Sequence, residues 1–341
     1  MNKNVHAMLA TALAVGLASA ASAQETTTLR MSTWVGPQHH LAADTLPVWF
    51  QAVEEASGGT LKIQLDPAPI AGAPEQYDIV RKGAADLAYH VMGYTPGPFE
   101  IVRGGELPFL SPSAEVGSQA VWDWYDRNIG FDQEFEDVKV VTLFVHGPGM
   151  LHTRDPIASL EDLANYKLRV GGGGVKIAQG LGATPVDVPA PQSYETIEKG
   201  VADGAMFPFE AVFGFNLFEL VNNHLEVPGG LYTTPFAVIM NKDKWDSLTE
   251  QQQAALTEAG GVAGAKILGQ GWDRADAKGE ELAMEHGGTV TTLSDEETSR
   301  WAEELEFMND EWIALANERG HDGEALLQDL RDTMEKFAAM N

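Results

Sequence analysis

The sequence predicts an α/β protein of two hinged lobes, and three observations lead to that prediction. Short apolar runs with strand and helix periodicity alternate from residue 28 to residue 242, which is typical of sheets covered by helices. The chain has 341 residues, which is long enough for two domains. A helical pattern from about Thr249 to His286 is long enough to cross both lobes.

The first half of the chain contains seven of these alternating segments. Leu61, Ile63 and Leu65 show the apolar alternation of a strand, and Gly83 closes a helical run. In chain order we expect strand 28–34, helix 45–59, strand 60–66, helix 74–83, strand 85–91, helix 113–127 and strand 138–147. This rhythm favours mostly parallel sheets with helices on both faces.

The second half repeats the rhythm before the chain becomes almost entirely helical. We expect strands at 167–170, 184–189, 204–210 and 235–242, and a helix at 193–200. Potential capping boxes for other helices are Ser159 with Asp162, Thr249 with Gln252, and Ser294 with Glu297. The glycines within the long run from Thr249 predict a bend in the interlobe helix.

Residues 1–23 have the pattern of a secretory signal peptide. Lys3 precedes an apolar run, and Ala21-x-Ala23 offers a cleavage site. The apolar run is too short for a membrane span. We therefore expect a soluble mature protein that is exported to the periplasm.

The composition excludes several classes of function. The chain has no cysteine, so thiol catalysis, thiolate metal sites and redox motifs are excluded. Its formal net charge of -28 disfavours binding to nucleic acid or anionic lipid, and it fits a soluble monomer. An anionic ligand would therefore need a local positive site to attract it.

Three possible motifs for cofactor, metal or enzyme chemistry are incomplete. The glycines 171–174 lack the Gly-Lys-Ser/Thr of a phosphate loop and the spacing of a dinucleotide fingerprint, so we expect no cofactor. His39, His40, His146 and His152 lack a metal-protease spacing, so we expect no metal; a pocket histidine that donates a hydrogen bond, such as His146, is favoured. No nucleophile elbow is present, and the sequence does not indicate an enzyme.

Arg169 is the strongest candidate for ligand binding. It lies between Leu168 and Val170 in an expected strand, so its side chain needs a partner or water in an apolar layer. A guanidinium offers a planar pair of donors that matches a carboxylate. From the residues alone, a structural ion pair with one of the many acids remains the alternative.

A series of short motifs follows in a fixed order along nearly the whole mature chain. Its central part is Lys167-Leu168-Arg169-Val170, Gly182-Ala183-Thr184-Pro185-Val186, Tyr194, Gly200, Asp203-Gly204 and Pro208. Upstream, residues 70–90 form a strand, glycine, helix, glycine, strand unit, and downstream residues 235–256 contain a strand before the long helix. In this ordered series the sequence resembles the solute receptors of TRAP transporters, the DctP-type family.

The resemblance implies a two-lobed periplasmic-binding-protein clamshell that closes on a carboxylate-bearing solute and delivers it to a membrane permease. It assigns the carboxylate salt bridge to Arg169. The expected signal peptide is 1–23. Lobe I would comprise residues 24–150 with about 234–275, and lobe II residues 151–233 with about 276–341, including the C-terminal helices.

The sequence departs from the family pattern at two positions that bear on the ligand. Phe207 stands where many members have asparagine, and Gly149 aligns with a second arginine of the sialic acid receptors. Both departures remove polar contacts. The expected pocket residues are therefore Arg169 with Trp34, Tyr89, His146, Phe207, Phe209 and Glu210, with Phe144, Met206 and Phe213 as further apolar candidates.

This set favours an aromatic or apolar monocarboxylate, such as benzoate or hydroxybenzoate, because aromatic faces pack planar solutes well. Glu210 would repel an anion unless it binds a hydroxyl or a cationic group, or points away. A C4-dicarboxylate, a sugar acid or an ectoine-like zwitterion remains an alternative ligand. An exported enzyme on a related fold is a more remote alternative.

Overall fold

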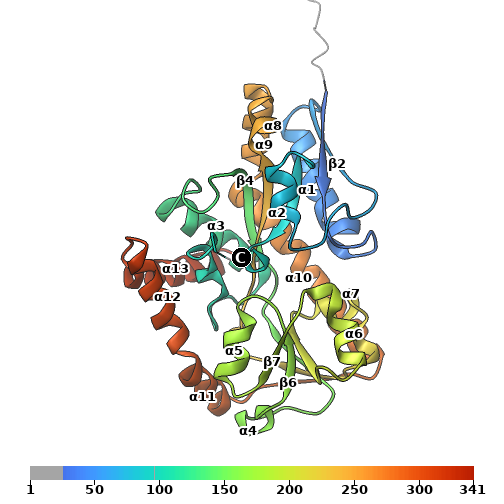
Figure 1. The fold of residues 1–341 in the computed structure, drawn as a ribbon, viewed down its shortest axis with the longest axis vertical. Helices are drawn as coiled ribbons and strands as arrows, with labels where there is room; N and C mark the ends of the chain where they lie inside the picture. The colour runs from blue at the N-terminus through green and yellow to red at the C-terminus, as the bar shows by residue number, and fades with distance from the viewer. Residues whose placement is uncertain (1–25, 96) are drawn as a thin grey trace, which may run out of the picture.

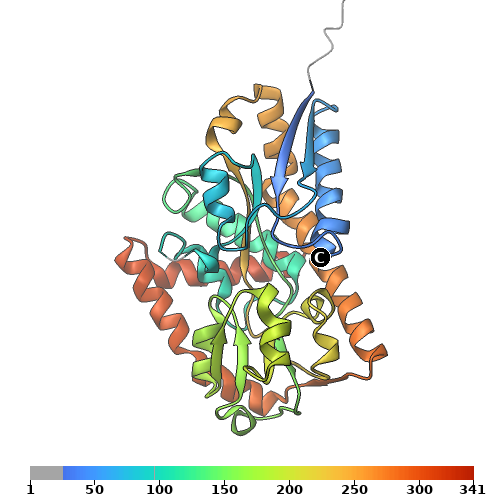
Figure 2. The same ribbon diagram turned by 45° about the vertical axis from the view of Figure 1, so that its right-hand side comes forward.

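The computed structural model describes residues 26–95 and 97–341, so the expected signal peptide lies outside the described residues. Two α/β lobes lie one above the other in Figure 1, each built on its own sheet. A long helix runs along one side of both lobes, and Figure 2 shows the same arrangement from a second direction. In the described part of the chain, no helix has the length and apolar character needed to cross a membrane.

The first lobe contains a five-stranded sheet in the order β2-β1-β3-β10-β4. Its strands are β1 (Thr27–Ser32), β2 (Leu61–Leu65), β3 (Leu87–Val91), β4 (Val138–Val145) and β10 (Pro235–Asn241). β1 is parallel to β2 and β3, whereas β10 is antiparallel to β3 and β4. β3 and β4 are almost wholly buried, as their continuous apolar sequences indicate.

The second lobe contains a six-stranded sheet in the order β11-β9-β5-β8-β6-β7. Its strands are β5 (Met150–Thr153), β6 (Lys167–Val170), β7 (Thr184–Asp187), β8 (Gly204–Phe207), β9 (Asn223–Glu226) and β11 (Thr289–Thr292). β6 is parallel to β7 and β8, whereas β5 is antiparallel to β8 and β9.

The two-lobed α/β fold is confirmed, but both sheets are mixed rather than mostly parallel. The antiparallel strands lie where the chain passes between the lobes. β4 leaves the first lobe and β5 enters the second, and the chain returns after β9 through β10. A strand that enters from the neighbouring lobe does not need the helical crossover that makes successive strands parallel.

Helices cover both sheets and account for most of the last third of the chain. Their bounds are α1 (Leu46–Ala56), α2 (Gln76–Arg81), α3 (Ala114–Asn128), α4 (Leu160–Leu163), α5 (Gly174–Gly180), α6 (Ser193–Glu198), α7 (Glu210–Gly214), α8 (Lys242–Asp246), α9 (Glu250–Ala259), α10 (Gly261–Glu285), α11 (Asp295–Leu305), α12 (Phe307–Glu318) and α13 (Gly323–Ala338).

Helix starts follow the capping residues read from the sequence. Ser159 and Thr249 each form a complete capping box, at the starts of α4 and α9. Ser294 accepts a hydrogen bond from the Glu297 amide at the start of α11, which satisfies one helix donor. The expected bend in the long helical run is a break between α9 and α10 at Gly260 and Gly261, the latter with a φ of +52°.

α10 joins the two lobes, because it contacts α3 and β4 in the first lobe and α7 and β11 in the second. α11 then contacts α5 of the second lobe, and α13 returns to α3 of the first. The Trp124 indole donates to the Leu326 carbonyl (3.0 Å), which fixes α13 against α3. The C-terminal helices therefore hold both lobes from the side opposite α10 (Figure 1).

Candidate ligand-binding site

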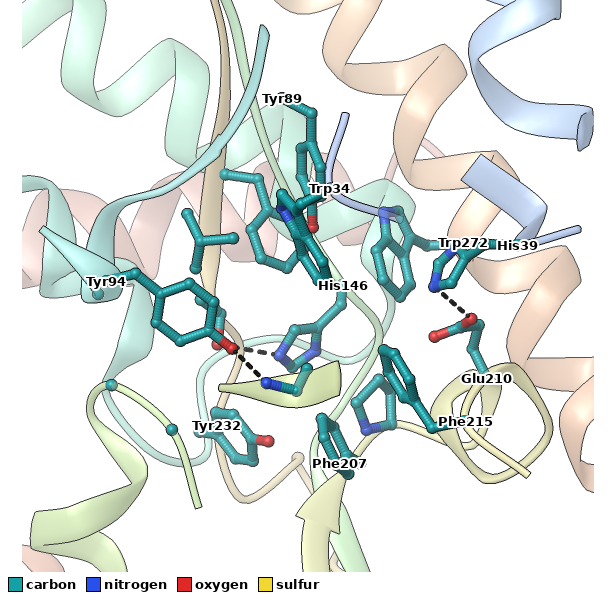
Figure 3. A pocket seen from close by; sticks show the side chains of 18 of the residues that line it. Trp34, His39, Tyr89, Tyr94, His146, Phe207, Glu210, Phe215, Tyr232 and Trp272 are labelled. Atoms are coloured by element: carbon teal, nitrogen blue, oxygen red, sulfur yellow. Dashed lines mark hydrogen bonds and ion pairs between the residues drawn. The ribbon is translucent and has the colours of Figure 1, made fainter. Parts of the chain in front are cut away.

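A cavity lies between the lobes, lined by residues from both (Figure 3). The space among the lining residues, including its open mouth, is about 600 Å³. The first lobe contributes residues of β3 and β10 and of the segments after β1, β3 and β4, and the second contributes residues of β6, β8 and α7. Its lining side chains include Trp34, His39, Tyr89, Tyr94, His146, Arg169, Phe207, Glu210, Phe215, Tyr232, Thr234, Phe236 and Trp272.

Arg169 is a buried cation at the wall of this cavity, with 2% of its surface exposed. β6 holds its backbone between β7 and β8, and its Nε and Nη2 donate to the Val188 carbonyl (3.1 and 2.7 Å). Its guanidinium carbon lies 4.1 Å from the centre of the Phe207 ring. Among the described residues it forms no ion pair with a carboxylate, so the alternative of a structural ion pair is not realised there.

Aromatic rings form most of the remaining wall. Trp34 stacks on Tyr89 with ring centres 5.5 Å apart, and Phe207 stacks on Phe215 at 5.7 Å. Trp272 is positioned from α10 and stacks on Phe236 at 5.5 Å. Flat apolar faces from both lobes therefore border the same space, a surface suited to a planar ligand.

A few polar groups interrupt these rings. His146 donates from Nδ1 to the Gly147 carbonyl (2.5 Å), so its Nε2 accepts from the Thr234 hydroxyl (3.1 Å). Burial lowers the pKa of His146 to about 4, so the ring is neutral at pH 7. Tyr94 of the first lobe accepts from the Ala190 amide of the second (3.0 Å), which leaves the Tyr94 hydroxyl proton free to be donated. The buried indole N–H of Trp34 has no acceptor among the described residues.

Glu210 begins α7 and is buried at another part of the wall, 4% exposed. Its Oε1 lies 3.1 Å from His39 Nε2 and 3.7 Å from His40 Nε2. Its backbone amide donates to Asp276 of α10 (2.8 Å). Gly279 permits this close approach, since a Cβ there would lie 2.4 Å from the Phe209 carbonyl oxygen.

Glu210 and His39 are both neutral, because burial disfavours a charge on either. Burial, followed by the nearby Asp276 carboxylate, raises the pKa of Glu210 well above its usual range. Burial lowers the pKa of His39 to about 4. The Leu41 amide donates to His39 Nδ1 (3.3 Å), which places the ring proton on Nε2, where it is donated to Glu210 Oε1.

His39, His40 and Glu210 each offer a ligand atom, and these atoms lie within 4.8 Å of one another. The hydrogen bond from Leu41 to His39 Nδ1 leaves the proton on Nε2, so that nitrogen has no lone pair for a metal. The cluster therefore suits a hydrogen-bonded acid better than a metal ion.

The structure brings six of the seven expected site residues to one cavity. Arg169, Trp34, Tyr89, His146, Phe207 and Glu210 all line it. Phe209 lies outside this lining and packs against His152 and His224, with ring centres 5.3 and 5.4 Å away. Phe213 is 42% exposed on α7, and Phe144 is buried behind Tyr89 in the core of the first lobe.

Several lining residues were not identified from the sequence. Tyr94, Phe215, Tyr232 and Trp272 come from loops or from the long helix, where neither strand periodicity nor the family motif marks them. His39 was considered only as a metal ligand. The signal that the sequence offered was the adjacent pair His39-His40 before the first helix.

Tyr232 explains the glycine at position 149. A Cβ on Gly149 would lie 2.1 Å from a Tyr232 ring carbon, so the tyrosine occupies the space of any side chain there. The Tyr232 hydroxyl donates to the Met206 carbonyl (3.0 Å), which fixes the ring against β8. An aromatic ring therefore fills the place that a second arginine would need.

Three solved structures with a similar fold contain bound aromatic acids. A marine metagenome TRAP solute-binding protein, crystallised with 3-hydroxybenzoate, is 35% identical with a TM-score of 0.86, covering 92% of this chain and 99% of its own. A Bordetella bronchiseptica protein with bound (R)- and (S)-mandelate is 31% identical, with a TM-score of 0.87 and coverage of 91% and 99%. A Rhodoferax ferrireducens protein with benzoate is 31% identical, with a TM-score of 0.86 and coverage of 92% and 99%.

The family model for bacterial extracellular solute-binding proteins of family 7, DctP, matches residues 31–314. Apart from the first four residues of β1, this match contains both sheets, and it also contains the cavity and α10. The protein therefore belongs to the DctP family, the periplasmic receptors that bind small organic acids and work with the membrane permease subunits of TRAP transporters.

Proposed function

We propose that this receptor binds an aromatic or otherwise apolar monocarboxylate of the benzoate or hydroxybenzoate type. The observation that carries the proposal is Arg169, a buried guanidinium at an aromatic-walled cavity with no carboxylate partner among the described residues. An unpaired buried charge is costly, and a ligand carboxylate would neutralise it. The ligand carboxylate would therefore be the ion-pair partner of Arg169.

The rest of the wall favours a ligand with one charge. Near Arg169 the cavity presents Phe207, Tyr232 and Tyr94 rather than a second cation. The second carboxylate of a C4-dicarboxylate, or the many hydroxyls of a sugar acid, would lose water without equivalent partners, at about 1–3 kcal/mol for each unsatisfied group. A benzene ring would instead pack between the stacked rings.

The relatives support the same ligand class. Three proteins that are 31–35% identical to this chain were crystallised with mandelate, benzoate or 3-hydroxybenzoate. All three ligands combine one carboxylate with a benzene ring, the combination that Arg169 and the stacked rings suit.

We also propose that the protein acts as a monomeric receptor and not as an enzyme. The cavity places no activated nucleophile beside the expected carboxylate position, since His146 is neutral and bonded at both ring nitrogens. Incubation with a bound ligand should return it unchanged, as chromatography of the recovered ligand would test.

The direct test is calorimetry of the mature protein with benzoate, succinate, glucuronate and ectoine at pH 7. Benzoate should bind with a Kd at least 100-fold below that of succinate. Thermal shift provides a second readout, because a ligand at 100 times its Kd stabilises the folded state by about 2.7 kcal/mol. Tighter binding of succinate, glucuronate or ectoine would reject the ligand class while leaving the receptor assignment intact.

A further inference from the structure

Glu210 is an acid in the wall of a cavity that we propose binds an anion. Its geometry shows how the acid and the anion can occupy the same cavity. Its Oε1 is occupied by the proton of His39 Nε2. Its other carboxyl oxygen points away from His39, toward the gap between the rings of Trp272 and Phe215 (Figure 3). As a neutral acid, Glu210 accepts through Oε1 and carries its own proton on this second oxygen.

A row of rings separates Glu210 from Arg169. The Arg169 guanidinium lies over Phe207, Phe207 stacks on Phe215, and Phe215 lies 5.8 Å from the His39 ring. His39 in turn holds Glu210. A planar ligand lying along this row would place its carboxylate at Arg169 and an opposite edge toward Glu210.

We propose that Glu210, positioned by His39, donates a hydrogen bond to an oxygen substituent on the ligand ring, so that the receptor selects hydroxylated aromatic carboxylates over unsubstituted ones. This inference rests on the proposed function, because it assumes that Arg169 holds the carboxylate. It assigns Glu210 as a specificity-determining residue and His39 as its positioning residue.

The surroundings of Glu210 favour a hydrogen-bond donor over an anion. The charged and titratable groups that face it are His39 and His40 from the first lobe, Tyr89 from β3 and Asp276 from α10. The histidines are neutral because burial lowers the pKa of each, and Asp276 is itself an acid. No cation among these groups would stabilise an ionised Glu210, whereas a neutral carboxyl needs only an acceptor from the ligand.

The test compares 3- and 4-hydroxybenzoate with the methylbenzoates of the same shape and with benzoate, by calorimetry at pH 7. The wild type should bind at least one hydroxybenzoate about tenfold more tightly than the corresponding methylbenzoate. Equal binding of each pair would overturn the inference, and continued binding of benzoate would show that the proposed function stands. Failure of every aromatic acid to bind would reject the proposed function itself.

Two substitutions at the same position identify the role of Glu210. Glu210→Gln keeps an acceptor for His39 and a donor toward the cavity, so the preference for hydroxybenzoate should stay within about threefold of wild type. Glu210→Leu removes both and should abolish that preference, so that each hydroxybenzoate binds no more tightly than the corresponding methylbenzoate. Loss of the preference in Glu210→Gln, or its retention in Glu210→Leu, would overturn the inference.

Glu198→Gln on the exposed surface of α6 is the matched control and should behave as wild type. Circular dichroism would show that each variant is folded. If Glu210→Leu does not fold, the wild-type ligand pairs and Glu210→Gln still decide the question. Tighter binding of ectoine than of any benzoate, lost in Glu210→Gln, would show that Glu210 acts as an anion and would overturn both proposals.

Discussion

Each end of the cavity contains a buried ionisable group, and a buried charge is costly. The two groups, Arg169 and Glu210, differ in how that cost is avoided. A guanidinium is a permanent positive charge in proteins, so at Arg169 only an anion can balance the charge. Glu210 can take up a proton, and burial together with Asp276 raises its pKa so that it does. The cavity therefore presents one cation and one neutral acid, an asymmetry that would orient the proposed ligand.

Replacing the cation should have the largest effect on binding. Arg169→Met keeps the apolar stem but removes the guanidinium, so benzoate should bind at least 100-fold more weakly, because breaking a buried ion pair costs about 3–5 kcal/mol. Calorimetry measures the loss. Arg169→Lys retains a charge and a donor for the Val188 carbonyl, and it should recover only part of the affinity because it lacks the paired donors.

Lys167→Met is the matched control for Arg169→Met, since Lys167 lies exposed on the same strand, two residues away. Its Kd for benzoate should equal that of wild type. A Kd for Arg169→Met within threefold of wild type would remove Arg169 from the site.

Replacing the ring under the cation should have a smaller effect. Phe207→Leu removes the face that contacts the guanidinium and stacks on Phe215, so benzoate should bind about tenfold more weakly, a loss of about 1.4 kcal/mol. Cyclohexanecarboxylate, which has no aromatic ring, should lose less. Phe209→Leu changes a nearby phenylalanine outside the cavity lining and should leave both affinities unchanged. Equal losses for the two ligands would show that Phe207 acts only by filling space.

The neutral end of the cavity should be visible as a pH dependence of stability. Burial raises the pKa of Asp276 to about 8, from about 3.9 in an unfolded chain. Between these values the folded state holds a proton that the unfolded state has lost, so the free energy of unfolding falls as pH rises from about 4 to 8. Asp276→Asn keeps an acceptor for the Glu210 amide and removes this titration.

The stability of Asp276→Asn relative to wild type should therefore increase between pH 5 and pH 8, by more than about 1 kcal/mol. Urea unfolding at several pH values measures the difference. Asp332→Asn, at an exposed position on α13, should show no such trend. A constant difference between Asp276→Asn and wild type would mean that Asp276 is ionised throughout this range.

The sequence predicted the elements that carry strong local signals. Long apolar strands such as β4 and β10, and capped helices such as α9, were located because periodicity and capping are local properties. The strands β5, β9 and β11 were not predicted. Each has four residues, and β5 and β9 contain the buried histidines His152 and His224, which hydrogen-bond to each other and break the apolar pattern.

The cavity residues also divide into those with a local signal in the sequence and those without one. Arg169 was identified because a charge within an apolar strand is visible locally, and Phe207 because it departs from a family pattern. The direction in which a side chain points after a turn cannot be predicted from the local sequence. Phe209, two residues beyond Phe207, lies against His152, whereas Trp272 reaches the cavity from a helix far along the chain.

The contact between Gly149 and Tyr232 has a consequence for how ligand classes can change in this protein. An arginine at position 149 would require the tyrosine ring to leave, because a single added carbon already lies 2.1 Å from it. Replacing Tyr232 first would open the space and remove the hydrogen bond to Met206 before any new cation was present. Whichever of the two positions is substituted first, the single variant has a disrupted pocket. A receptor with two arginines would therefore require changes at positions 149 and 232 together.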